Sequence, residues 1–166
     1  VEKLVGLVRN AAVDCVRRHG GLVNQALGEE IVTLFGVPTA HEDDDLRAVR
    51  AAMELHARVR DMGTSIQLQS GVHGGAVVAQ RVVEGPRRYG VTGAAAQVAA
   101  RLAELAPHGA ILVSPECRRL LAPFVHTEAH EIVLLQSDTA AITPWRVIGE
   151  SGLQTRLEAA VRKGLT

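Results

Sequence analysis

The stretch that best indicates the fold is residues 20–38, which read GGLVNQALGEEIVTLFGVP. Two short apolar runs, residues 22–27 and 31–35, flank the polar residues Gly-Glu-Glu at 28–30. Runs of this length separated by a glycine-containing turn are typical of a β-hairpin. A Gly-Gly pair precedes the hairpin and Gly-Val-Pro at 36–38 follows it, so both ends are marked by residues that interrupt regular structure.

Helical periodicity flanks this hairpin on both sides. Residues 2–19 carry apolar side chains at helical spacing, and a second helix is expected to start within Thr39–Asp45 and to run to about Met62, with Gly63 as its C-cap. The acids at 42–45 fall where a helix dipole favours negative charge, so we interpret them and His41 as a helix start rather than a metal site. We expect further strands at 65–72, 76–83, 89–92, 110–113, 124–135 and 144–148, and further helices at 93–105, after Ser114-Pro115 and at 153–163.

Hairpins that alternate with single helices indicate an α+β fold with a mostly antiparallel sheet. Ser114 and Pro115 suit the N-cap and the first position of a short helix. His73 lies between the strands expected at 65–72 and 76–83, with no Cys or Asp at ligand spacing, so we expect it to pack structurally.

Composition excludes several classes of function. The 166 residues carry no net formal charge and only four scattered aromatic side chains, which argues against a nucleic-acid partner. No apolar run approaches the roughly 20 residues that a membrane helix needs, so we expect no membrane association. Cys15 and Cys117 have neither CxxC spacing nor an evident disulfide partner, and we expect a cytoplasmic location.

Three stretches together resemble one known family. They are residues 20–38 running into AHED at 40–43, the segment QSGVHGGAVV at 69–78, and YGVTGAAAQVAARL at 89–102. Their order is similar to that of the hairpin, the next hairpin and the Gly-Asp-two-Asn-three-Arg segment of class III adenylate and guanylate cyclases. The resemblance is strongest to bacterial members that are fused to an ATPase module, and it covers most of residues 1–149.

The resemblance implies a ferredoxin-like α+β fold, an antiparallel sheet with helices packed on it. Residues 1–149 would form the cyclase-homology domain without its opening strand, and residues 150–166 a linker and tail helix toward a downstream ATPase or effector module. The family converts a purine nucleoside triphosphate to cyclic nucleotide and pyrophosphate with two Mg²⁺ or Mn²⁺ ions, and its sites lie between the two protomers of a homodimer. Any residues that match the family's site are therefore expected at a dimer cleft.

The metal positions of the family match poorly. Its first metal Asp lies on the opening strand, and its second falls on Glu29, whose side chain is one methylene longer. Mg²⁺ requires near-ideal octahedral geometry, so a single Glu is a poor site and a solvated turn is the simpler interpretation. If the domain is inactive, it needs no metal cofactor.

Of the family's remaining site positions, one carries the family's residue in this chain. The resemblance places the purine-selecting residues on Gln25 and Gly90, the transition-state Asn on Gln97 and the transition-state Arg on Arg101. The Asp of the third motif is replaced by Ala94. Arg101 alone keeps the family's residue, although a solvated residue on a helix would look the same in sequence.

Three functions remain open from sequence. The first is a degenerate cyclase domain that acts in intracellular signalling as a regulatory or dimerising module. The second is an active adenylate or guanylate cyclase once the opening strand is present, and the third is a nucleotide-binding sensor without turnover. Without the opening strand, we expect the remaining strands to close the gap directly or to exchange within a homodimer, because unpaired strand edges are unfavourable.

Overall fold

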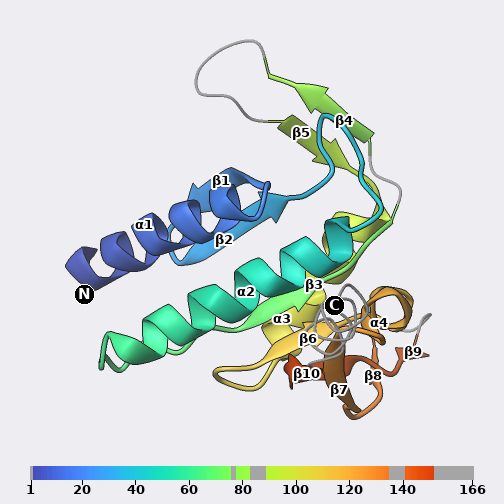
Figure 1. The fold of residues 1–166 in the computed structure, drawn as a ribbon. Helices are drawn as coiled ribbons and strands as arrows, with labels where there is room; N and C mark the ends of the chain where they lie inside the picture. Colours follow the sequence, from blue (N-terminus) through green and yellow to red (C-terminus); the bar gives the residue numbers. More distant parts are fainter. Residues whose placement is uncertain (1, 76–77, 83–88, 135–140, 152–166) are drawn as a thin grey trace, which may run out of the picture.

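The computed structural model describes residues 2–75, 78–82, 89–134 and 141–151 (Figure 1). Within this part of the chain there are four helices: α1 (Glu2–Arg18), α2 (Asp44–Asp61), α3 (Ala94–Leu105) and α4 (Pro115–Leu121). The strands are β1 (Leu22–Leu27), β2 (Glu30–Leu34), β3 (Ser70–Val72), β4 (Val78–Arg81), β5 (Tyr89–Thr92), β6 (Ile111–Val113), β7 (Val125–Ala129), β8 (Val133–Leu134), β9 (Ala141–Ile142) and β10 (Trp145–Glu150).

The largest sheet of the described residues has four strands in the order β3-β6-β10-β7. Strands β3 and β6 are parallel, whereas β6–β10 and β10–β7 are antiparallel. Three two-stranded antiparallel sheets, β1–β2, β4–β5 and β8–β9, complete the pairing. In Figure 1, α1 and α2 run side by side, with α1 beside the β1–β2 hairpin and α2 along β3. The predicted α+β fold with mostly antiparallel pairing is confirmed.

The apolar core lies around β6. One cluster joins Val49 of α2 to Ile111, Val113 and residues of α4 and β7, and a second joins Leu102 of α3 to Leu112 and the segments that flank α3 and β6. Leu102 and Leu112 are completely buried. Because β6 contributes alternate side chains to the two clusters, it is the centre of the scaffold.

Most predicted elements are present, with shifted ends. The first helix and the hairpin form as predicted, and Ser114 caps α4 by accepting the backbone N–H of Cys117 at 3.3 Å. Helix α2 begins at Asp44, within the region 39–45 predicted for its start. The strand predicted at 124–135 is interrupted between β7 and β8, and β9 was not predicted. The tail helix predicted at 153–163 lies outside the described residues.

One predicted pairing is wrong. Residues 65–72 and 76–83 were expected to pair as a hairpin, but β3 pairs with β6 and β4 pairs with β5. Gly71 explains the position of β3, since a Cβ atom there would collide with the backbone of Ala99 and Ala103 in α3. The glycine therefore allows α3 to lie directly on β3, while the chain after His73 continues to a separate two-stranded ribbon.

The four-stranded sheet and the β1–β2 hairpin do not pair with each other. In the described residues β2 pairs only with β1, and β3 pairs only with β6. Direct closure between these strands, one of the two outcomes expected from sequence, is therefore not what the chain does. Each of β2 and β3 keeps one edge without a strand partner in the described part of the chain. None of the described helices is both long and apolar enough to cross a membrane.

Candidate functional site

The β1–β2 hairpin presents two of the candidate residues. Gln25 is exposed on β1, opposite Val32, and Glu29 is exposed in the turn between the strands. Gly28 adopts a φ of 57°, a conformation that favours glycine and makes this tight turn accessible. A guanidinium N–H of Arg9 in α1 donates to the Gly28 carbonyl, so the turn is fixed to the first helix.

Asn24 connects the hairpin to β5. The register of β1 against β2 shifts between Val23 and Gln25, which makes Asn24 the extra residue of a β-bulge. Its side-chain Nδ2 donates to the Tyr89 carbonyl at 2.9 Å, and its Oδ1 accepts the Tyr89 backbone N–H at 2.6 Å. The candidate residues Gln25 and Gly90 each directly follow one partner of this double hydrogen bond. Sequence analysis did not identify Asn24.

Helix α3 carries the other two candidates one turn apart. Gln97 is exposed, and the side chain of Arg101 is 42% exposed. The Arg101 guanidinium donates to the Leu134 carbonyl at 3.3 Å and contacts the Glu104 carboxylate at 3.1 Å. Ala94, at the first position of the helix, is exposed and offers no acid. Neither of these Arg101 contacts reaches the hairpin.

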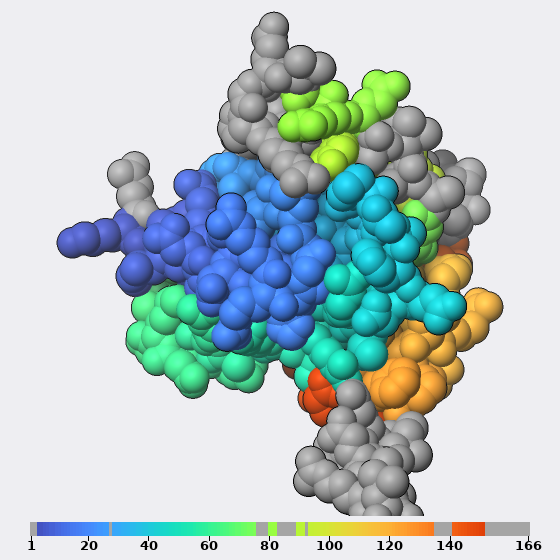
Figure 2. Space-filling view, turned by 45° about the horizontal axis from the view of Figure 1, so that its top comes forward, coloured from blue at the N-terminus to red at the C-terminus, as the bar shows by residue number. Residues whose placement is uncertain are grey.

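The structure thus groups the candidates unevenly. Gln25 and Gly90 lie on strands of two separate sheets, β1 and β5, which the Asn24 hydrogen bonds join, and Gln97 and Arg101 share a helix that follows β5. Glu29 lies in the turn that follows β1, whereas Asn24 lies inside the strand. In Figure 2 the β4–β5 ribbon, in yellow-green, rises beside the surface formed by α1 and the hairpin, in blue.

The acids do not fit a site for two divalent ions. Among the described residues there is no group of three or more His, Cys, Asp or Glu side chains that could hold a metal. Glu29 is exposed on a turn whose preceding carbonyl already accepts from the Arg9 guanidinium. A carboxylate in this setting lacks the converging oxygen ligands that Mg²⁺ or Mn²⁺ requires.

The acidic run and His73 have structural roles. The backbone N–H of His41 donates to the Asp44 carboxylate at 2.7 Å, and Asp44 and Asp45 lie in the first turn of α2. This agrees with the predicted helix start. The Nδ1 of His73 lies 2.6 Å from the Ser114 hydroxyl, which itself caps α4. His73 therefore packs between β3 and α4, as expected.

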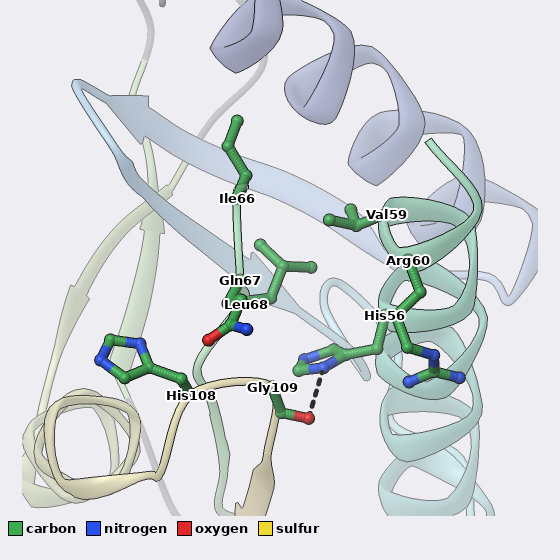
Figure 3. A pocket seen from close by; sticks show the side chains of 8 residues that line it. All are labelled: His56, Val59, Arg60, Ile66, Gln67, Leu68, His108 and Gly109. Carbon is green, nitrogen blue, oxygen red and sulfur yellow. Dashed lines mark hydrogen bonds between the residues drawn. The ribbon is translucent and has the colours of Figure 1, made fainter. Parts of the chain in front are cut away.

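A cavity of about 230 Å³ lies elsewhere, at the end of α2 (Figure 3). It is bounded by the last turns of α2, residues 66–68 and the loop at 108–109, and it includes none of the candidate residues. His56 on its wall is 4% exposed, with Nδ1 3.2 Å from the Gly109 carbonyl and Nε2 2.7 Å from the Ser70 hydroxyl. Burial, with a smaller contribution from the Arg60 charge, lowers the pKa of His56 to about 4, although the hydrogen bond with the Gly109 carbonyl acts in the opposite direction. The ring joins α2 to the sheet and is neutral at physiological pH.

Comparison with known proteins agrees with the fold and the motif order. The family model of the adenylate and guanylate cyclase catalytic domain matches residues 16–145. The chain belongs to this family. Because the match covers most of the described residues, the resemblance seen in three motifs extends through α4 and β7. It brings no assignment of the five candidate residues.

Relatives and solved structures extend this comparison. An uncharacterized protein of Mycobacterium tuberculosis is 34% identical over 107 residues, which cover 64% of the chain and 20% of that protein. A longer one from Rhizobium meliloti is 27% identical over 98% of the chain and 16% of its own length. The cyclase domain thus spans about a fifth of the curated relatives it matches.

Two solved cyclases share the fold. The adenylyl cyclase CyaB from P. aeruginosa superposes with a TM-score of 0.79 at 17% identity, covering 89% of the chain and 81% of that structure. The guanylyl cyclase Cya2 gives a TM-score of 0.73 at 27% identity, covering 91% and 83%. The expected class III cyclase fold is confirmed.

Proposed function

We propose that this cyclase domain is a regulatory and dimerising module of a signalling protein and forms no cyclic nucleotide by itself. The observation that carries the proposal is the set of residues at the family's metal and acid positions. Glu29 is exposed on a turn, and Ala94 supplies no carboxylate at the start of α3. Phosphoryl chemistry of this kind depends on charge neutralisation by positioned ions, and these residues do not provide the ligands.

Arg101 supports the same proposal. It is the one candidate with the family's residue type, yet its guanidinium contacts Leu134 and Glu104 of its own chain. To stabilise a transferring phosphorus, the side chain would have to leave both partners. In the folded domain the Arg101 guanidinium is therefore engaged in a surface contact.

A regulatory role for this domain requires a larger protein that contains the module it regulates. The aligned segments cover only 20% and 16% of the relatives from Mycobacterium tuberculosis and Rhizobium meliloti, which leaves room in them for the ATPase or effector module that the resemblance implied. One solved structure of similar fold is a non-canonical dimeric guanylyl cyclase domain of a fusion protein from Blastocladiella emersonii, with a TM-score of 0.80. We propose that two copies of the present domain also pair, in the cytoplasm, and pass their arrangement to the downstream module.

Nucleotide binding without turnover is a second candidate function. A guanylate cyclase domain from Catenaria anguillulae, with a TM-score of 0.79, is known in complex with GTP. In the present chain β1 and β5 are held together by the two Asn24 hydrogen bonds, so the strands that carry Gln25 and Gly90 remain assembled. This favours a site that still binds the purine base of the nucleotide but no longer binds the metal ions.

The test is a cyclase assay and calorimetry on the full-length protein and on the chain of this sequence. We expect no cyclic nucleotide from ATP or GTP with Mn²⁺ or Mg²⁺, and sedimentation should detect a dimer. Cyclic nucleotide that disappears in Arg101→Ala would show that the domain is an active cyclase. Heat of binding for ATP or GTP without product would establish the sensor, and its absence would leave the dimerising scaffold.

A further inference from the structure

The β4–β5 ribbon has little of its own to fix its position. In the described residues its two strands pair only with each other, from Val78↔Thr92 to Arg81↔Tyr89. An isolated two-stranded ribbon is marginally stable in water, so its placement depends on contacts with the rest of the domain. Gly90, in the middle of β5, adds no side chain that could form one.

Asn24 makes a contact suited to this task. The bulge at Asn24 removes it from the regular β1–β2 register, and bulges commonly re-aim a side chain beside a functional site. Its amide then matches the backbone of Tyr89 as a neighbouring strand would, with one hydrogen bond donated and one accepted. Only one orientation of the amide satisfies both bonds, and Tyr89 is 9% exposed. A part-buried N–H and C=O are thus paired by one side chain.

The position of this contact suggests its purpose. Gln25 follows Asn24 and Gly90 follows Tyr89, and these are the two positions at which the family's purine-selecting residues fall. A shift of β5 along β1 would change the separation of residues 25 and 90 directly. The amide of Asn24 resists that shift because both its hydrogen bonds go to a single residue.

We propose that Asn24 is a positioning residue that fixes β5 against β1 and thereby sets which purine the domain accepts. This rests on the proposed nucleotide binding. Asn24 acts through the strands, so its removal alters discrimination between ATP and GTP without removing a group that touches the base.

Three variants of the full-length protein test this: Asn24→Ala, Asn24→Asp and the control Gln69→Ala. Gln69 also donates a side-chain hydrogen bond to a backbone carbonyl, that of Ala106, at a place remote from the hairpin. Hydrogen exchange at the Tyr89 amide is measured without nucleotide, and the dissociation constants of ATP and GTP are measured by calorimetry.

In Asn24→Ala we expect exchange at Tyr89 to accelerate about fivefold or more, as the loss of one hydrogen bond implies. Asn24→Asp should be intermediate, because its carboxylate still accepts from the Tyr89 N–H but cannot donate to the carbonyl. The ratio of the ATP and GTP dissociation constants should change in the same order, whereas Gln69→Ala should leave both the Tyr89 amide and the ratio unchanged.

Unchanged exchange at Tyr89 in Asn24→Ala would overturn the proposal at its first step. Faster exchange with an unchanged ratio would reduce Asn24 to a structural contact and also overturn it. If the parent protein binds neither nucleotide but Tyr89 responds, the proposed nucleotide binding fails and the role in purine choice fails with it, while the strand contact stands.

Discussion

The four-stranded sheet and the β1–β2 hairpin are held in place by different forces. The sheet lies between completely buried apolar side chains, such as Leu102 and Leu112, that join it to α2, α3 and α4. In the hairpin, no described side chain of β1 or β2 is fully buried, and polar contacts from Arg9 and Asn24 fix its ends. The scaffold is thus apolar and central, whereas the elements that carry Gln25 and Glu29 are attached at its margin.

The largest effect should come from the centre of the scaffold. Leu112→Ala removes a fully buried side chain of β6 and should lower the free energy of unfolding by about 2–5 kcal/mol. Leu34→Ala in β2 removes a half-buried one and should cost about half as much or less. Chemical denaturation of both variants measures the contrast. Equal losses would show that the hairpin belongs to the main core.

Acid should weaken the scaffold through His56. Its pKa of about 4 in the folded chain lies below the ordinary value of 6.5, so the unfolded chain binds the proton first as pH falls. The stability is present above pH 6.5 and is lost as pH falls toward 4, by about 3 kcal/mol from this one group.

Replacement of His56 by Asn should flatten that pH dependence, measured by denaturation between pH 7 and 4. His126→Asn provides the matched control variant, because it removes an imidazole that is exposed on β7 instead of buried. His19 contributes in the same direction, because burial, Arg18 and Arg50 lower its pKa. A pH dependence of stability that persists in His56→Asn would assign the acid sensitivity to His19 instead.

Local signals in the sequence predicted local structure well. Ser114 and Pro115 predicted α4, and Gly28 predicted the hairpin turn, because caps and turns depend on a few adjacent residues. The acids at 42–45 indicated the start of α2, which begins at Asp44, where the carboxylate of Asp44 accepts the His41 N–H. The charge pattern predicted the region in which the helix starts but not its first residue.

Contacts between distant residues could not be predicted in this way. The parallel pairing of β3 with β6 joins segments about 40 residues apart, and the bond from Asn24 to Tyr89 spans 65. A bulge depends on the register of two strands, which the composition of β1 does not specify. The five candidate residues were found by resemblance, whereas the contacts that position them needed the three-dimensional structure.

The open edge of β2 gives a smaller, local effect. Amides of Ile31–Leu34 that do not pair with β1 should exchange faster than those of Ile111–Val113 in β6, which has strand partners on both sides. Hydrogen exchange at low protein concentration measures this. Protection of β2 that rises with concentration would indicate strand exchange within a homodimer, the second outcome expected from sequence. Equal protection at low concentration would contradict the separation of the two regions.

The smallest effect on stability should come from Arg101→Ala. The side chains of Arg101 and Glu104 are 42% and 69% exposed, and such surface pairs contribute about 0.2–1 kcal/mol. Glu104→Ala is the matched control, because it removes the same ion pair but leaves the guanidinium bound to the Leu134 carbonyl. Denaturation should barely separate the two variants from the parent chain.

Because both variants keep the fold, differences between them in nucleotide binding report on the Arg101 guanidinium itself. If Arg101 contributes to the nucleotide cleft, Arg101→Ala should weaken triphosphate binding, while Glu104→Ala, which keeps the guanidinium and removes a competing carboxylate, should leave that binding unchanged or strengthen it. Equal binding by all three proteins would assign Arg101 to the surface of α3 and restrict nucleotide recognition to the hairpin and β5. A large loss of stability in Arg101→Ala would instead show that its hydrogen bond to Leu134 stabilises the scaffold. The candidate residues on α3 would then belong to the scaffold and not to its margin.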